Sequence, residues 1–546
     1  MIRFFCALAL TVAVATFPPA ARASEAVEFS TIRHLVVQDN GRLKAFDTYA
    51  RERLRFVHGR ERLDGQEPVE TVLSFAFDAE RWDERPVLDV PYIPLFGALG
   101  YDKEKKYLSL AEFRSQLPTL RGLVRAPGVS PGGSKRLAEA ANELAARADA
   151  LRALTEFEDR VPIVPGVSDD PHAEWMPLAS ATGHSEEDMA AVRAAFESLR
   201  TAFLDGNGPA FDEASRDLIE RLRALNPAVY PKAGRVALEA HTNAFKPFRA
   251  AWLLYVATLL LALMSLWSKR AGLYVALFVV LVLSTLVHAY GLAVRTIIAG
   301  RAPLTNMYES LIFMSWGIAV LGVIFEAKYR LRFAALIASV LGILTITIAQ
   351  RLTIDINPAI APLRSVWLTY HVLTVMLGYS AFAVALGAGH LVVGRAALSA
   401  VQPERADRLD DFVYRVLQVG VLFLTAGIVT GAVWANYSWG RSWGWDPKET
   451  WSLITLLGYL AVLHARHQRW LGGFGMGAAS ILCFLLVVMT YYGVNYILHG
   501  LHSYAGDEPR RLPAWLIAYV VFEGLYVGAA ALIVSVRRQA RRVASG

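Results

Sequence analysis

The sequence has little cysteine and little charge. Its two cysteines are Cys6, near the N-terminus, and Cys483, inside an apolar run, so a mature disulfide, a cysteine-based metal site and a thiol relay are not expected. Because only 19% of the residues are charged and 55% are hydrophobic, the chain is typical of an integral membrane protein and not of a soluble enzyme. The net charge of +7 does not indicate a nucleic-acid partner, because much of the basic excess lies in short loops beside apolar runs.

The N-terminus has the pattern of a secretory signal. Arg3 precedes an apolar stretch from Phe4 to about Phe17, and Ala21-Arg22-Ala23 follows as an A-x-A cleavage site. This pattern predicts a signal peptide at residues 1–23, with an uncleaved anchor as the alternative. In either case the residues that follow are expected to be exported.

Residues 24–248 contain no apolar run long enough to cross a bilayer, and we expect them to form an exported, mostly helical domain of unknown role. Helix signals lie near 134–158, 185–205 and 209–225, the second of them opening on a Ser185–Asp188 capping pattern. A few strands are expected near 69–77. The histidines of this domain are scattered, and none of its residues forms a catalytic pattern.

The remaining residues, 249–546, predict an all-α polytopic transmembrane domain. About nine apolar segments are long enough to cross a membrane as helices, near 251–267, 272–295, 308–326, 333–350, 367–393, 412–434, 450–468, 473–493 and 513–536. If residues 24–248 are exported, the alternate loops that face the cytoplasm all carry lysine or arginine, as the positive-inside rule requires. Those loops hold Lys269, Arg270, Lys328, Arg330, Arg332, Arg395, Arg405, Arg408, Arg466 and Arg469, and the basic C-terminal tail lies on the same side.

A tryptophan cluster lies between the sixth and seventh segments, on the predicted outer side. Five of the thirteen tryptophans fall within 434–451, namely Trp434, Trp439, Trp443, Trp445 and Trp451. The segment is too polar and too rich in glycine to be a span, so it is interpreted as an outer loop that offers flat faces to a flat ligand. The alternative is an ordinary interfacial belt of aromatic residues.

Two histidines are expected at the depth of this loop. His371 lies just inside the outer end of the fifth segment, and His502 lies in the outer loop after the eighth. Two neutral imidazoles facing each other across an aromatic platform can be axial ligands of haem iron, and His499 competes with His502 for one position. Arg441 and Lys448 can meet the haem propionates. Asp446 and Glu449 either join the site or cap the seventh helix; capping is the favoured reading for Glu449.

Three further histidines lie within apolar segments, where ionisable residues are costly and usually functional. His464 lies near the inner end of the seventh segment, His288 in the second and His390 near the inner end of the fifth. Depth pairs His464 with His390, while a hydrogen-bonded interhelical histidine is the simpler reading of His390.

With these features assembled, residues 270–536 resemble the CcsA/ResC family of cytochrome c biogenesis proteins (system II), which handle haem and carry a W-W-D signature. The resemblance rests on W-G-R-S-W-G-W-D-P-K-E-T-W from Trp439, L-H-A-R ending at Arg466, Y-H-V around His371, G-L-H-S-Y-A from Gly500 and R-A-P-L-T-N-M-Y-E-S-L from Arg301. It implies a protein of the bacterial inner membrane, with residues 24–248 and the tryptophan loop on the periplasmic side.

The resemblance also implies roles for individual residues. His371 and His502 would hold a transient, bis-histidine haem b beneath the tryptophan loop, for covalent attachment to the C-x-x-C-H cysteines of apocytochrome c. His464 would match the family's intramembrane haem ligand, with His288 as the leading second ligand within the chain, or with a histidine from a ResB/CcsB-type membrane partner. The chain would be part of a cytochrome c haem lyase. The alternatives are a haem exporter or carrier without synthase activity, and a b-type cytochrome in quinone-linked electron transfer.

Overall fold

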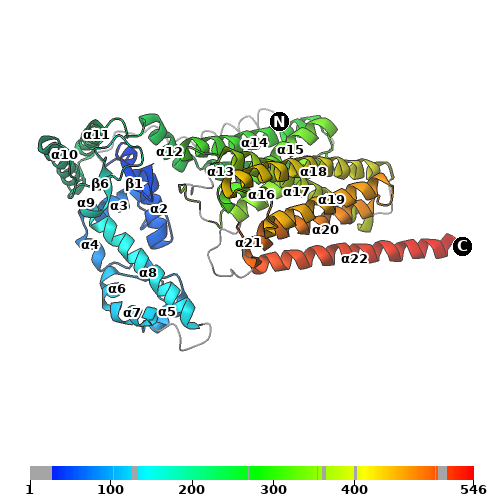
Figure 1. The fold of residues 1–546 in the computed structure, drawn as a ribbon, viewed down its shortest axis with the longest axis horizontal. Coiled ribbons are helices and arrows are strands. Elements are labelled where there is room, and N and C mark those ends of the chain that lie inside the picture. Colours follow the sequence, from blue (N-terminus) through cyan, green and yellow to red (C-terminus); the bar gives the residue numbers. More distant parts are fainter. Residues whose placement is uncertain are drawn as a thin grey trace. The chain divides into compact units, whose positions relative to one another are not determined.

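The computed structural model describes residues 27–102, 104–125, 133–268, 270–352, 354–358, 365–398, 403–498, 500–501 and 513–545. The chain divides into two compact units, Met1–Phe245 and Lys246–Gly546 (Figure 1). The predicted signal peptide lies outside the described residues and stays a prediction.

The first unit is predominantly helical, with three small two-stranded antiparallel sheets. Its apolar core joins the larger helices to the first sheet, in which Val36 pairs with Ala45. The strands are β1 (Val36–Asp39), β2 (Arg42–Ala45), β3 (Leu88–Asp89), β4 (Tyr107–Leu108), β5 (Pro162–Val164) and β6 (Met176–Pro177). The helices are η1 (Ile32–His34), α2 (Phe46–His58), α3 (Pro68–Phe77), α4 (Glu80–Asp83), α5 (Ile93–Ala98), α6 (Leu110–Ser115), α7 (Leu117–Arg125), α8 (Gly133–Thr155), α9 (Phe157–Arg160), α10 (Glu186–Leu204), α11 (Gly208–Leu225) and α12 (Ala233–Phe245).

The three long helices expected in this unit are present as α8, α10 and α11. The Ser185 hydroxyl accepts the backbone N–H of Asp188 at 3.0 Å, so Ser185 caps α10 as its sequence pattern predicts. The Asn207 side chain caps α11 in the same way through Ala210. Local capping chemistry therefore determines where these helices begin.

The prediction of strands near 69–77 is wrong, because this segment is helix α3. Pro68 occupies the first turn, where its missing N–H costs nothing, and Glu67 and Glu70 form a capping box. A short apolar run fits a buried strand and a buried helix equally well by its periodicity. The proline and the two glutamates at its start decide for helix.

The second unit is a helical bundle in which each of the nine expected segments is a helix. Its helices are α13 (Pro247–Trp267), α14 (Ala271–Ala299), α15 (Met307–Tyr329), α16 (Phe333–Ala349), α17 (Val366–Leu398), α18 (Pro403–Trp439), α19 (Pro447–His467), α20 (Phe474–Val488), the π-helical turn η3 (Met489–Gly493), α21 (Val494–Ile497) and α22 (Ala514–Ser545). Among the described residues, seven helices are long and apolar enough to cross a membrane. The shorter α16 and the more polar α19 fall outside that set, so the count of nine spans stays a prediction. The chain is an all-α, multi-pass membrane protein.

The basic loops gather at one end of this bundle. The Arg332 side chain donates to the Ser265 carbonyl, which joins the α15–α16 loop to the end of α13. Arg466 pairs with Asp411 at 3.2 Å, and Arg537 donates to the Ala397 carbonyl. The shared location of these loops is what the positive-inside pattern requires of one membrane side.

Helix α17 is the centre of the bundle and packs on α15, α16, α18, α20 and α22. Its closest neighbour is α18, because glycines let the two backbones approach. An added Cβ at Gly420 would stand 2.4 Å from the Phe382 ring, and one at Gly427 would stand 2.5 Å from the Val375 side chain. Gly420 and Gly427 are seven positions apart, which is about two helical turns, so both face α17.

Candidate functional site

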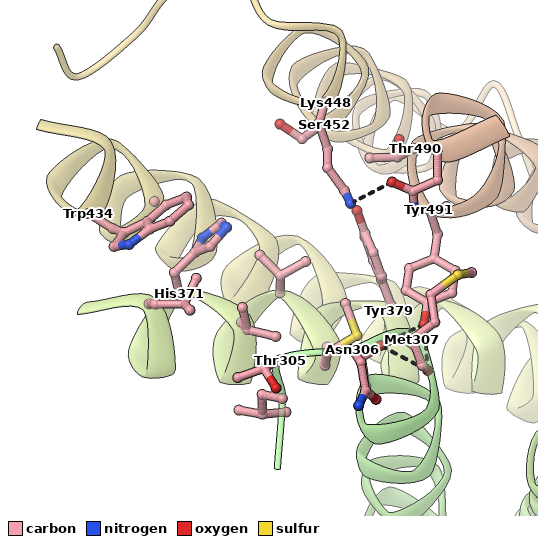
Figure 2. Close-up of a pocket in the computed structure, with 18 of the residues that line it drawn as sticks. Thr305, Asn306, Met307, His371, Tyr379, Trp434, Lys448, Ser452, Thr490 and Tyr491 are labelled. Atoms are coloured by element: carbon pink, nitrogen blue, oxygen red, sulfur yellow. Dashed lines mark hydrogen bonds between the residues drawn. The ribbon is translucent and has the colours of Figure 1, made fainter. Parts of the chain in front are cut away.

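A cavity of about 520 Å³ lies within the second unit (Figure 2). Its lining residues in α15 and α17 come from the ends of these helices that lie opposite the basic loops. It is lined by residues from α15, α17, α18, α19, η3 and α21 and from the loops before α15 and α17. Its volume lies within the range of roughly 300–1,000 Å³ that is usual for small-molecule and cofactor sites. Its lining includes Thr305, Asn306, Ser310, Asp355, Asn357, His371, Tyr379, Trp434, Trp443, Lys448, Tyr491 and Asn495.

His371, in the second turn of α17, lines this cavity and is held by α18. Its Nδ1 lies 2.7 Å from the carbonyl oxygen of Gly427. Because a carbonyl can only accept, Nδ1 carries the proton and Nε2 of the neutral ring keeps its lone pair. Metal-binding histidines are typically fixed in this way, with one nitrogen donating to a backbone carbonyl.

The position of the His371 ring depends on a glycine one helical turn further along α18. A Cβ added at Gly431 would stand 2.6 Å from Nδ1 of His371, so only a glycine leaves space for the ring. The same ring stacks on Trp434, with 6.1 Å between ring centroids and 9° between planes. Figure 2 shows the two rings side by side at the edge of the cavity.

The five tryptophans do not form a single loop, which corrects the interpretation of 434–451. Helix α18 continues to Trp439, because W-A-N-Y-S-W contains no helix breaker, and Gly440 ends it with a φ of 71°. Only residues 440–446 form the connection to α19. The aromatic surface is therefore built largely on the ends of two helices.

The tryptophans also differ in what they contact. Trp434 is buried, lines the cavity and meets Trp439 edge to face at 4.7 Å. Trp443 lines the cavity as well, and Trp445 packs edge to face on it while remaining 70% exposed. Trp451 lies within α19, and its carbonyl accepts from Thr455 and Thr490. Two of the five, Trp434 and Trp443, thus line the described cavity.

Asp446 and Glu449 cap α19. Asp446 is the N-cap, Pro447 occupies the first turn, and the two acidic side chains form a capping box. Glu449 accepts the backbone N–H of Gly444 at 2.7 Å and that of Asp446 at 3.2 Å. The capping role favoured for Glu449 is therefore present in the structure, and Asp446 shares it.

The two basic residues of this region are placed differently. Lys448 lines the cavity from the first turn of α19, and its Nζ lies 3.4 Å from Oδ1 of Asn495. Arg441 folds back over Gly444 instead, and its guanidinium lies 3.8 Å from the Glu449 carboxylate. Of the two, Lys448 is the cation that lines the cavity within the described residues.

The cavity also has a polar wall that was not singled out from the sequence. The Tyr491 hydroxyl lies 2.6 Å from the Ser310 hydroxyl, and Asn495 meets Lys448 on the same side. Tyr491 belongs to the π-helical turn Met489–Gly493, an irregularity that is frequent at functional sites. The signal available in the sequence was T-Y-Y-G-V-N-Y at 490–496, a polar and aromatic stretch inside an apolar run.

Each of the three intramembrane histidines makes its own contacts. His288 is fully buried, with Nδ1 at 3.1 Å from the Tyr255 hydroxyl. His390 uses both ring nitrogens, one with the Leu386 carbonyl and one with Glu523 on α22 at 2.9 Å. His464 is exposed in the last turns of α19, with its ring against Trp470. None of these contacts joins His464 to His288 or His390 directly, and the assignment of His464 and a second histidine as ligands of an intramembrane haem stays a prediction.

His502 and its competitor His499 lie outside the described residues, and their assignment as ligands stays a prediction. Gly500 and Leu501, between them, are described. The backbone N–H of Leu501 donates to Oδ2 of Asp446 at 2.6 Å. The chain therefore reaches the beginning of α19 one residue before His502.

Comparisons with known proteins identify relatives of this chain. Residues 304–502 match the sequence model of a family described as Cytochrome C assembly protein. The chain is 34% identical over 278 residues to the cytochrome c biogenesis protein CcsA of Prochlorococcus marinus subsp. pastoris, which covers 45% of this chain and 87% of that relative. A second CcsA, from Prochlorococcus marinus strain MIT 9303, is 32% identical over 297 residues, or 93% of its length.

Two further similarities are broader or weaker. Protein NrfI of Wolinella succinogenes is 27% identical over 512 residues, which cover 87% of this chain and 54% of NrfI. This similarity extends into the first unit, although the chain spans only about half of NrfI. A solved structure described as Cytochrome c Heme Lyase CcmF aligns with a TM-score of 0.38 and 15% identity, over 53% of this chain and 50% of that one.

The fold and the cavity define a polytopic helical membrane protein with a cavity at one end of its bundle. The chain belongs to the CcsA-like family of cytochrome c assembly proteins. Its function accordingly lies in cytochrome c biogenesis.

Proposed function

We propose that the protein binds haem in the 520 Å³ cavity and presents it for covalent attachment to the C-x-x-C-H cysteines of an apocytochrome c. In this proposal haem is the cargo, held as a transient b-type haem with His371 and His502 as axial ligands. The observation that carries the proposal is the hydrogen bond from His371 Nδ1 to the Gly427 carbonyl at 2.7 Å. It leaves Nε2 as the electron-pair donor that iron requires.

The other residues of the cavity fit the same cargo. Trp434 and Trp443 offer aromatic surface to a flat macrocycle. Lys448 supplies a positive charge for propionate, and Asn495 beside it adds a hydrogen-bonding amide. Arg441 is the weaker of the two basic candidates, since it is turned toward Glu449.

The attachment reaction needs no nucleophile from this chain. Each apocytochrome thiol adds across a haem vinyl group, so that the S–H bond and the π bond of the vinyl C=C are replaced by a C–S and a C–H bond, while the C–C single bond remains. What the protein contributes is a fixed geometry, which converts a bimolecular encounter into an intramolecular one. His371 and the aromatic side chains hold the cargo, and the substrate's own histidine then displaces one of the axial ligands.

The remaining parts of the proposal concern location and partners. The cavity end of the bundle and the first unit face the periplasm of a bacterial inner membrane, and the basic loops face the cytoplasm. His464 is exposed on α19, which suits a second haem ligand supplied by a ResB/CcsB-type partner. A permanent electron-transfer haem between His464 and His390 is disfavoured, because the Leu386 carbonyl and Glu523 engage both ring nitrogens of His390.

The test is co-expression of the full chain with a C-x-x-C-H apocytochrome in a host that lacks its own cytochrome c assembly. Covalent haem on a denaturing gel is the readout. Holocytochrome that forms with this chain and disappears with His371→Ala supports the proposal. His184→Ala is the control, because His184 lies in the first unit and its ring meets the Pro165 carbonyl.

Two other outcomes are informative. Haem on the purified protein without holocytochrome would indicate a carrier that needs a membrane partner for attachment. Unchanged haem in His371→Ala would overturn the assignment of this cavity.

A further inference from the structure

Glu309, in the first turn of α15, is fully buried and accepts four hydrogen bonds. Oε1 accepts from Nε of Arg295 at 3.0 Å. Oε2 accepts from Nη1 of Arg301 at 2.9 Å, and from the backbone N–H and hydroxyl of Thr305 at 3.0 and 3.1 Å. One carboxylate therefore joins the end of α14, the loop before α15 and α15 itself.

The two arginines extend these contacts to a second loop. Arg295 donates through Nη1 to the Ile354 carbonyl at 2.9 Å, and Arg301 donates through Nη2 to the Asn357 carbonyl at 2.9 Å. Each guanidinium thus uses one side for Glu309 and the other for the backbone of 354–357. A planar fork with several donors suits this double role in a way that a lysine does not.

Both loops held in this way line the cavity. Thr305 and Asn306 belong to the loop before α15, and Asp355 and Asn357 to the loop before α17. The arginines and Glu309 are not among the lining residues, so their effect on a ligand passes through the loops. Figure 2 shows Thr305, Asn306 and Met307 facing the same space as His371.

A buried carboxylate can also have a purely structural role, and the same helix provides the comparison. Glu326, near the other end of α15, is equally buried. It accepts the backbone N–H of Arg332 at 2.8 Å and that of Ala335 at 3.3 Å, at the end of the bundle that carries the basic loops. Glu326 therefore joins α15 to the start of α16 and is not among the described residues that line the 520 Å³ cavity.

We propose that Glu309 is a positioning residue for the cargo, since it fixes through Arg295 and Arg301 the two loops that form one wall of the cavity. The inference rests on the proposed function, because it concerns the cavity in which haem is proposed to bind. With the wall fixed, the distance between it and His371 is set before the ligand enters. Loss of the Glu309 charge frees both arginines and both loops, and the bound ring then loses its alignment with His371.

The experiment compares Glu309→Gln with Glu326→Gln in the full chain, purified in detergent. Haem is titrated into each protein, and both the dissociation constant and the absorption spectrum of the bound iron are recorded together with the melting temperature. We expect Glu309→Gln to weaken haem binding by about tenfold or more and to change the spectrum. Glu326→Gln is expected to lower the melting temperature while leaving the spectrum and the affinity of the folded protein unchanged.

Arg301→Lys is the second variant, and it keeps the charge beside Glu309 while losing the fork that reaches Asn357. If Glu309→Gln fails to fold, Arg301→Lys is still expected to fold. It is expected to show the same change in the haem spectrum. Unchanged haem binding in both Glu309→Gln and Arg301→Lys, or an equal loss in Glu326→Gln, would overturn the inference. A wild-type chain that takes up no haem would overturn the proposed function instead, which is a distinguishable result.

Discussion

Asp446 accepts the backbone N–H of Leu501 at 2.6 Å, although 55 residues separate them in the sequence. The same side chain caps α19, so one carboxylate joins the tryptophan connection to the segment that leads into His502. Gly500 makes the approach possible, because an added Cβ there would stand 2.3 Å from Oδ2 of Asp446. The W-D-P-K-E stretch thus holds a distant part of the chain beside the cavity.

This contact predicts the effect of Gly500→Ala. The new methyl group separates Leu501 from Asp446 and displaces the segment before His502, so we expect a severalfold loss of holocytochrome in the co-expression assay. Gly528→Ala is the control, since an added Cβ on α22 meets nothing within 4 Å. Equal holocytochrome yields from the two variants would show that the Asp446 contact does not matter to function.

A second prediction concerns the space behind His371. Gly431→Ala forces the imidazole away from its position against the Gly427 carbonyl. Because contacts of this kind orient a metal ligand, haem retained by the purified protein should fall by about 10-fold or more, as in His371→Ala. The measurement is the haem-to-protein ratio after purification, with Gly524→Ala on α22 as the neutral glycine substitution.

A third prediction separates two basic residues, Arg441 in the connection between α18 and α19 and Lys448 in the first turn of α19. Lys448→Met removes the cation that lines the cavity, and we expect haem affinity to fall about tenfold, which corresponds to roughly 1.4 kcal/mol. Arg441→Met removes a partly exposed pairing at 3.8 Å and should change haem affinity by less than about twofold. Haem titration of both variants decides the point, and a larger effect of Arg441→Met would reverse the assignment.

A fourth prediction concerns the pH dependence of the first unit. Asp39 lies at the end of β1, where it accepts from Lys44 at 2.8 Å and from Arg53. Burial alone would raise the pKa of Asp39, but the charges and hydrogen bonds of Lys44 and Arg53 outweigh it, so the pKa lies below its ordinary value. The folded state therefore binds this proton less readily than the unfolded state does.

The sign of the effect follows from that difference. The stabilisation is fully present above the unfolded pKa of about 3.9 and is lost as the pH falls through the lower folded pKa. Asp39→Asn should cost about 2 kcal/mol at neutral pH, because it removes the carboxylate that pairs with Arg53 and leaves Lys44 with Glu52 as its remaining ion-pair partner. Unfolding of the full chain, followed from pH 7 downward, should show the gap between wild type and Asp39→Asn closing below about pH 4. If the difference in stability between wild type and Asp39→Asn stays constant down to low pH, the loss does not come from the charge of Asp39.

Much of the fold was predictable because its signals are local. Apolar runs of helical length located α13 to α22, and the caps at Ser185 and Asp446 located helix starts. The segment at 69–77 was assigned wrongly because its apolar pattern alone does not distinguish two buried conformations. The tryptophan segment was read as a single loop because its polarity ends a membrane span, whereas a helix continues until Gly440 ends it.

The candidate site was only partly predictable. His371, Trp434 and Lys448 were recognised by residue type and depth, and the structure brings these three to one cavity. The depth of a residue in the membrane does not predict that Glu523 engages His390 or that Tyr255 engages His288, since both partners lie on other helices. The cavity wall held by Glu309 was not predicted either. Arg295 and Arg301 donate to backbone carbonyls more than forty residues away in the sequence, and no local pattern indicates such contacts.

The sequence by itself determined the class of protein, the number of apolar segments, their alternating basic loops and the aromatic stretch that carries the family resemblance. These properties follow from composition and short-range pattern, which act on each segment independently of the others. Only the tertiary structure decided which tryptophans line a cavity, which cation reaches it and which histidines already have partners. Those outcomes depend on how helices pack, and on glycines such as Gly427 and Gly431 that let α17 and α18 approach until a single imidazole fits between them.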